Sequence, residues 1–209
     1  MAEAAIVHVI DDDEAIRLSL SFLLETAGFQ VKVYDSALAF LDRPDLPRSG
    51  CVVTDVRMPD MDGLTLQRTM IERKVMLPVI VMTGHGDVPV AVQALKAGAA
   101  DFIEKPFDDE LLIRAIHAAL ERNRREREEH DEAAAVAARL SVLTPRELEV
   151  LAGLVKGHPN KTVAYDLGIS ARTVEVHRAR VMDKMQARNL SELVRMWLSH
   201  RARSGDSGD

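Results

Sequence analysis

The sequence predicts an α/β domain built on a five-stranded doubly wound parallel sheet, followed by a small all-α helix-turn-helix domain. Short β-branched runs alternate with helical patterns over residues 1–105, which is the order of repeated βα units. The runs at 51–53 and 79–82 are apolar throughout, as strands buried on both faces of a sheet are. Beyond residue 140 only helical patterns follow, and a glycine-containing turn at 167–170 separates two of them.

The expected elements alternate regularly along the first half of the chain. Strands are expected at 5–10, 30–34, 51–55, 79–83 and 101–104. Helices are expected between them, at 14–27, 36–41, 64–73 and 88–97. A fifth helix starts after Asp108 and should continue to about residue 139, because this stretch has no glycine or proline and pairs opposite charges four residues apart.

The second half begins with a clear helix start. Thr144 is an N-cap residue, proline follows it, and Glu147 completes a capping box three residues later. That helix should end near Gly157, and further helices are expected at 160–166, at 171–185 and after Asn189. The resulting organisation is a first domain at 1–120, a helical linker at 121–140, a second domain at 141–203 and a disordered tail at 204–209.

Charge and composition narrow the choice of function. The net charge is −6, but acidic residues exceed basic ones in 1–120 while basic residues exceed acidic ones in 141–203, which suggests a nucleic acid as the partner of the second domain. Cys51 is the only cysteine, which excludes an internal disulfide and a cysteine-cluster metal site. Neither a membrane-spanning run nor a signal peptide is recognisable, so we expect a cytoplasmic protein with no membrane partner.

Polar residues follow the predicted strands at their carboxyl ends, where functional groups of parallel sheets gather. They are Asp11, Asp12 and Asp13 after the first strand, Asp55 and Thr83 at the ends of the third and fourth, and Lys105 after the fifth. Converging carboxylates repel one another and need a cation, for which Mg²⁺ with its preference for oxygen ligands is suited. With Mg²⁺ present, an aspartate can attack a phosphoryl group while Lys105 neutralises charge and Thr83 hydrogen-bonds a phosphoryl oxygen.

The helix at 171–185 has two distinct faces when its residues are placed at 100° intervals. Val174, Val181 and Met185 share the face expected to pack inward, with the stem of Arg178 beside them. The outward face, suited to the major groove of DNA, consists of Arg172, Val176, Ala179, Arg180 and Asp183. Residues expected to contact phosphates are Thr173, His177 and Lys184, with Asn160 and Lys161 at the start of the preceding helix.

These motifs resemble two known modules. The first domain resembles the receiver domain of two-component response regulators, which has a flavodoxin-like fold, through DDDE (11–14), TDVRMPDMDG (54–63), MTGHGD (82–87) and FIEKPF (102–107). Residues 141–200 resemble the LuxR/NarL type of DNA-binding domain, through LTPRELEVL, NKTVAYDLGIS and ARTVEVHRARVMDKM. The combination is similar to response regulators of the FixJ type.

The resemblance implies a role for each pocket residue. It implies that Asp55 is the phosphoacceptor, that Lys105 is the partner of the phosphate, and that Thr83 and Phe102 form a switch pair. It implies that Mg²⁺ is bound directly by Asp12, Asp55 and the backbone carbonyl of Arg57, with Asp11 acting largely through water. Asp13 is a third acid after the usual pair, and we expect it on the rim of the pocket.

The resemblance also implies partners. They are a cognate sensor histidine kinase, double-stranded promoter DNA, RNA polymerase and, on phosphorylation, a second copy of the chain bound around Val88, Val92 and Lys96. The expected function is a phosphorylation-activated transcription regulator that catalyses only its own Mg²⁺-dependent phosphotransfer and autodephosphorylation.

Two other functions would use part of the same residue pattern. A Mg²⁺-dependent phosphohydrolase with an aspartate nucleophile uses similar residues, but it needs a second aspartate two positions after the nucleophile, where this chain has Arg57. A DNA-binding protein that keeps the first domain only as a dimerisation scaffold would not need the complete phosphate pocket.

Overall fold

The computed structural model describes residues 5–46, 49–84 and 88–204. The chain divides into two compact units, one ending at Glu126 and the other beginning at Arg127. Each unit has its own hydrophobic core. Within the described ranges, no helix combines the length and the apolar character needed to cross a membrane.

The first unit contains a parallel sheet of five strands in the order β2-β1-β3-β4-β5. The strands are β1 (Ile6–Ile10), β2 (Gln30–Tyr34), β3 (Cys51–Asp55), β4 (Val79–Thr83) and β5 (Asp101–Glu104). Every neighbouring pair runs parallel. The predicted fold class is therefore confirmed, and the strand bounds differ from the expected ones only at the start of β1.

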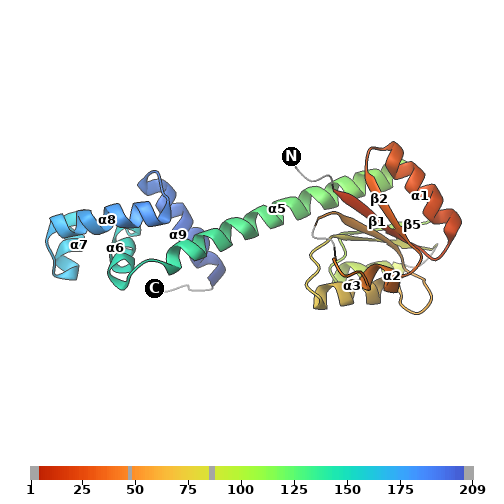
Figure 1. Cartoon of the computed structure of the whole chain (residues 1–209), viewed down its shortest axis with the longest axis horizontal. Helices are drawn as coiled ribbons and strands as arrows, with labels where there is room; N and C mark the ends of the chain where they lie inside the picture. Colours follow the sequence, from red (N-terminus) through yellow and green to blue (C-terminus); the bar gives the residue numbers. More distant parts are fainter. Residues whose placement is uncertain (1–4, 47–48, 85–87, 205–209) are drawn as a thin grey trace. The chain divides into compact units, whose positions relative to one another are not determined.

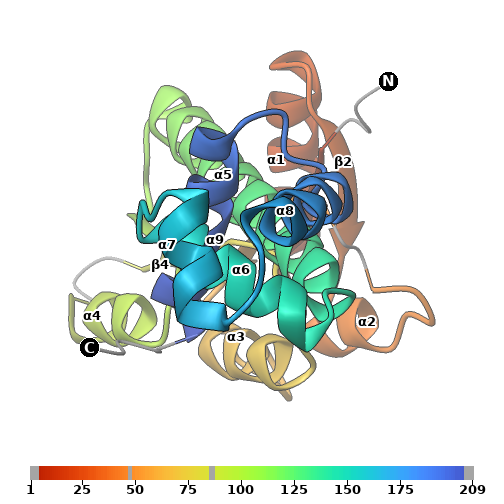
Figure 2. The ribbon, with the colours of Figure 1, turned by 90° about the vertical axis from the view of Figure 1, so that its left-hand side faces the viewer.

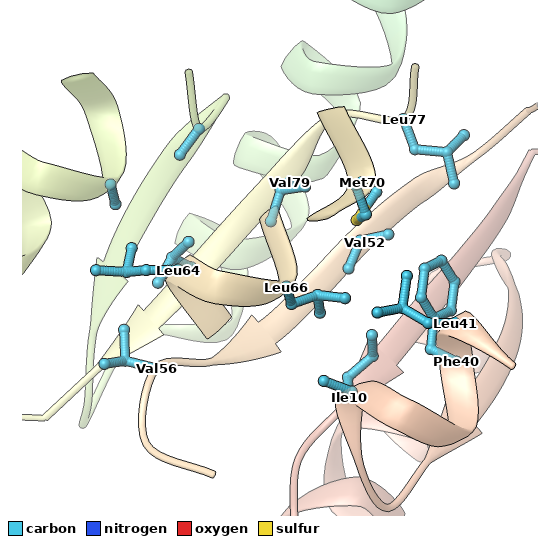
Figure 3. Close-up of a cluster of buried hydrophobic side chains, with 14 of the residues drawn as sticks. Ile10, Phe40, Leu41, Val52, Val56, Leu64, Leu66, Met70, Leu77 and Val79 are labelled. Atoms are coloured by element: carbon cyan, nitrogen blue, oxygen red, sulfur yellow. The ribbon is translucent and has the colours of Figure 1, made fainter. Parts of the chain in front are cut away.

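Helices cover both faces of this sheet (Figure 1). One face is covered by α1 (Glu14–Thr26) and by the first part of α5 (Asp109–Ser141), and the other by α2 (Ala37–Leu41), α3 (Gly63–Glu72) and α4 (Val88–Lys96). Successive residues of β3 pack on opposite faces of the sheet. Val52 belongs to the core under α2, α3 and α4, and Val53 belongs to the core under α1 and α5. Figure 3 shows Val52 in the first of these cores, with Leu66 of α3 and Phe40 of α2. Two buried faces are the reason the runs at 51–53 and 79–82 are apolar throughout.

The second unit is all-helical (Figure 2). It consists of α6 (Pro145–Val155), α7 (Asn160–Leu167), α8 (Ala171–Met185), α9 (Leu190–Ser204) and the last turns of α5. Local signals determine where its helices begin and end. Thr144 and Glu147 form the predicted capping box of α6, Gly168 ends α7 in the left-handed conformation, and Ser170 caps α8.

The last turns of α5 belong to the core of the second unit. Val136 and Leu140 are 2% and 8% exposed and pack with residues of α6 and α8. The expected continuation of the fifth helix beyond the first domain is confirmed. Within the stretch expected to be a linker, 121–140, these two apolar residues pack into the core of the second unit, and the division between the two compact units falls after Glu126.

Candidate functional site

The carboxyl ends of β1, β3 and β5 bring three charged side chains together. Asp11 follows β1, Asp55 ends β3, and Lys105 follows β5. The Lys105 Nζ donates hydrogen bonds to Asp55 Oδ1 at 2.6 Å and to Asp11 Oδ2 at 3.0 Å. In the sheet, β1 and β3 are neighbours and only β4 lies between β3 and β5. The lysine side chain that follows β5 is long enough to span this distance and reach both carboxylates.

The two aspartates differ in their access to solvent. The side chain of Asp11 is 2% exposed and that of Asp55 is 13% exposed. The second oxygen of each carboxylate is held by a backbone N–H: Asp13 donates to Asp11 at 2.9 Å, and Arg57 donates to Asp55 at 2.5 Å. Asp11 is therefore fixed from within the fold, whereas Asp55 is a positioned carboxylate that a reactant can approach.

The electrostatics of the pocket depend on Lys105. Its partial burial disfavours the ammonium form, but hydrogen bonds and attraction from Asp55 and Asp11 outweigh this effect and raise the pKa of Lys105 above its ordinary value. Lys105 is consequently a permanent cation at neutral pH. One ammonium does not balance two carboxylates, so the pocket retains negative charge. Asp12, the next residue after Asp11, is exposed.

The pocket fits a hard divalent cation by the chemistry of its donors. Its groups are carboxylate oxygens at two strand ends, with the backbone carbonyl of Arg57 in the following loop, and Mg²⁺ prefers oxygen ligands of these kinds. Among the described residues, no three side chains of histidine, cysteine, aspartate or glutamate lie close enough to form a metal cage. A bound Mg²⁺ would thus depend on water or a phosphoryl oxygen for part of its coordination, which is its usual habit.

The proposed switch residues lie on neighbouring strands. Thr83 ends β4 and is 2% exposed, and its carbonyl accepts a hydrogen bond from the Lys105 backbone N–H at 2.8 Å. Phe102 on β5 is 38% exposed, so part of its ring faces solvent. Asp13 is exposed and caps α1 by accepting from the Ala15 N–H.

Two further residues support the pocket and were not singled out from the sequence. Arg17 of α1 donates to the backbone carbonyl of Asp11 at 2.8 Å. Gly63 lies against the backbone of Asp55, since a Cβ at this position would stand 2.4 Å from the Asp55 carbonyl oxygen. The signal available for Gly63 was its place at the end of the TDVRMPDMDG motif (54–63), directly after the N-cap residue Asp62.

In the second unit, α8 has the two faces that its sequence predicts. Val174, Val181 and Met185 are fully buried. Val176 on the opposite side is 47% exposed, although valine is ordinarily an interior residue. The other residues of the outward face are also exposed, namely Arg172, Ala179, Arg180 and Asp183.

The residues expected to contact phosphates differ in their exposure and in their hydrogen-bond partners within the chain. Lys161 is exposed at the start of α7, while the Asn160 side-chain oxygen accepts from Arg178 at 3.4 Å. The Thr173 hydroxyl is hydrogen-bonded to that of Ser170 at 2.8 Å. His177 is half-buried, and its Nδ1 is buried without a hydrogen-bond partner among the described residues.

Lys184, which is also expected to contact a phosphate, has partners inside the second unit. The helical wheel grouped it with the phosphate contacts, but its Nζ donates to Glu147 Oε2 at 2.7 Å and to the Val142 carbonyl at 3.2 Å. Its charge is therefore already paired inside the second unit. A wheel gives the direction of a side chain around the helix axis but not the neighbour that stands there.

Comparison with known proteins agrees with this two-part architecture. Residues 7–117 match the family "response regulator receiver domain", and residues 141–197 match the family "bacterial regulatory proteins, luxR family". The chain belongs to the response regulators. A receiver joined to a LuxR-family domain makes it a phosphorylation-dependent transcription regulator of a two-component system, a class that works with a histidine kinase and with DNA.

Relatives of this response regulator match over nearly its whole length. The transcriptional regulatory protein FixJ of Azorhizobium caulinodans is 55% identical, with 95% of this chain and 94% of the relative covered. FixJ of Rhizobium meliloti is 54% identical, over 92% and 95% of the two chains. Among solved structures, the response regulator StyR has a TM-score of 0.84 at 38% identity, over 94% and 99% of the chains. Full-length FixJ from B. japonicum has a TM-score of 0.61 at 49% identity, over 95% and 98%.

Proposed function

We propose that Asp55 accepts the phosphoryl group from the phosphohistidine of a sensor kinase. A carboxylate oxygen of Asp55 attacks the phosphorus, a P–O bond forms, and the P–N bond to the kinase histidine breaks. The departing imidazole nitrogen keeps the electron pair of the broken bond. The observation that carries this proposal is the pair of contacts that hold the Asp55 carboxylate, from Lys105 Nζ and the Arg57 N–H, while leaving it partly exposed.

The neighbouring residues stabilise the transferred group. Lys105, 2.6 Å from Asp55, is close enough to exchange its bond with Asp55 for one with a phosphoryl oxygen. Thr83 at the end of β4 offers a hydroxyl to another of these oxygens. The residues that would hold Mg²⁺ directly are Asp12, Asp55 and the carbonyl of Arg57, with Asp11 acting largely through water. When bound, the ion supplies neutralisation of the phosphoryl charge.

The second half of the proposal is that α8 reads promoter DNA and that phosphorylation raises the affinity of the chain for it. The support is an exposed valine flanked by Arg172 and Arg180 on a helix that follows a short glycine turn. A transcription regulator bound at a promoter meets RNA polymerase there, and we include the polymerase as a partner.

The test begins with genomic fragments selected by the chain in the presence of Mg²⁺ and acetyl phosphate. Affinity for a selected fragment should rise by roughly 10²–10⁴ on phosphorylation, because two linked DNA-binding units then act together on two half-sites. Fluorescence anisotropy at fixed salt, with and without the phosphodonor, measures the change. A chain that selects no fragment in either state, or that binds equally in both, would contradict the proposal.

We also propose that phosphorylation drives homodimerisation through the surface formed by α4, β5 and the start of α5. Val92 and Leu95 of α4 are each 45% exposed beside Phe102 of β5, and Lys96 adds a charge at the edge. The side chain of Val88 lies outside those that the structure describes. Apolar groups left in water on one face favour association with a second copy.

Sedimentation of the beryllofluoride-treated chain tests the dimer. The treated parent should dimerise, and Val92→Asp should shift it to monomer because a buried carboxylate at an apolar interface is costly. Ile71→Asp is the matched control, since Ile71 is 58% exposed but belongs to α3, which is not part of this surface, and the variant should still dimerise. Equal dimerisation of the two variants would exclude this surface.

A further inference from the structure

The C-terminal end of α8 is fastened to the junction between α5 and α6. Lys184 Nζ donates to Glu147 Oε2 at 2.7 Å and to the Val142 carbonyl at 3.2 Å. From the last turn of α5, Arg139 donates to the carbonyl of Met185, the final residue of α8, at 3.4 Å. The C-terminal end of α8 is thus held at two points, the side chain of Lys184 and the backbone carbonyl of Met185.

Glu147 is the central group of this junction. Its side chain is only 3% exposed, and the oxygen that accepts from Lys184 also accepts from the Thr144 N–H at 2.8 Å. The hydrogen bond from Lys184, followed by that from Thr144, lowers the pKa of Glu147 to about 2, so the carboxylate is ionised at neutral pH. A carboxylate that is 3% exposed is not available to contact DNA directly, so we look for its influence in the residues that it holds.

The two kinds of DNA contact respond differently to a loose helix. Contacts to base edges require fixed positions, whereas a lysine on a flexible stem can follow a phosphate when the helix moves. At 1.5 Å per residue, α8 is about 22 Å long. If its C-terminal end can move, the outward face of the helix, which is the face proposed to read DNA, is displaced along its length. Loosening the C-terminal end should therefore harm sequence recognition more than general attraction to DNA.

We propose that Lys184 is a positioning residue for DNA recognition, which acts by clamping α8 to Glu147 and the α5–α6 junction instead of contacting a phosphate. This inference rests on the proposed reading of DNA by α8. It assigns to Glu147, Val142 and Arg139, none of which lies on the reading face, a part in the sequence preference of the chain.

The experiment compares full-length Lys184→Met and Glu147→Gln, singly and combined, with the parent chain. Each beryllofluoride-treated protein is titrated onto a duplex that the parent selects from a random pool and onto a scrambled duplex, over a series of salt concentrations. Lys161→Met is the matched control, because Lys161 is an exposed lysine at the start of α7. Lys184→Arg tests rescue by a residue that can keep the ion pair.

The clamp predicts that both single variants lower discrimination between the duplexes by roughly ten-fold, within the range of one lost base contact, and that the salt dependence does not change. The double variant should lose no more than the worse single one, and Lys184→Arg should restore discrimination. Lys161→Met should instead weaken binding to both duplexes and reduce the salt slope by about 0.9, the value for one phosphate.

Three results would overturn the inference. Equal losses on both duplexes with a smaller salt slope for Lys184→Met would show a phosphate contact. Equal losses with an unchanged slope would show that the ion pair serves folding alone. Unchanged discrimination in Glu147→Gln would show that the buried carboxylate has no influence. If the parent selects no duplex, the proposed DNA recognition itself fails, which is a different outcome from any of these.

Discussion

An Asp55→Asn chain is expected to take up no phosphoryl group from acetyl phosphate or from a phosphorylated kinase. Asparagine has nearly the same shape, and its carbonyl oxygen can still accept from Lys105, although its NH2 group cannot accept from the Arg57 N–H. An amide oxygen carries no negative charge, so it is too weak a nucleophile to attack phosphorus. Intact-protein mass spectrometry after incubation with Mg²⁺ and the phosphodonor should show one added phosphoryl group on the parent and none on the variant.

Asp45→Asn is the matched control for this loss. Asp45 is exposed and lies outside the strand ends that form the pocket, so its replacement should leave labelling at the parent level. Labelling of Asp55→Asn at the same rate as the control would mean that another residue accepts the phosphoryl group.

A Gly63→Ala chain should lose about a hundred-fold in phosphorylation rate while Asp55 itself is unchanged. The added Cβ would stand 2.4 Å from the Asp55 carbonyl oxygen and 3.2 Å from its carbonyl carbon, so the backbone that carries the nucleophile has to move. A displacement near 1 Å in a reacting group can cost a factor of about 10² in rate. Single-turnover labelling with acetyl phosphate at saturating Mg²⁺ measures the effect.

Gly28→Ala separates displacement from loss of stability. Gly28 has φ of +90°, so alanine there is strained by about 1–2 kcal/mol, but its Cβ would have no atom within 4 Å. This variant should therefore melt at a lower temperature than the parent and label at the parent rate. A Gly63→Ala chain that labels as fast as Gly28→Ala would show that the loop yields without moving the carboxylate.

The features that could be predicted from the sequence are those set by nearby residues. The strand ends at Asp55 and Thr83 were predictable because an apolar run stops one or two residues before each, and parallel strands place such ends at one edge. The buried face of α8 was predictable because a single helical period places Val174 and Val181 together.

The features that could not be predicted depend on partners distant in the chain. The ion pair between Lys184 and Glu147 could not be predicted, because Glu147 lies 37 positions earlier and nothing near Lys184 in the sequence indicates it. Val136 and Leu140 were assigned to a linker because charged residues dominate that stretch, and only the spacing of four between them indicates a buried side.

The division of α5 between two cores determines where such a regulator can be joined to another. Residues 124–130 are all exposed, whereas Val136 and Leu140 are built into the core that carries α8. In a hybrid regulator joined at residue 141, the core positions occupied here by Val136 and Leu140 would carry side chains from an unrelated parent. A hybrid joined within the exposed stretch, without adding or removing residues, would keep both cores native, so exchange of sensory inputs should succeed when the cut lies inside the helix and not at its end.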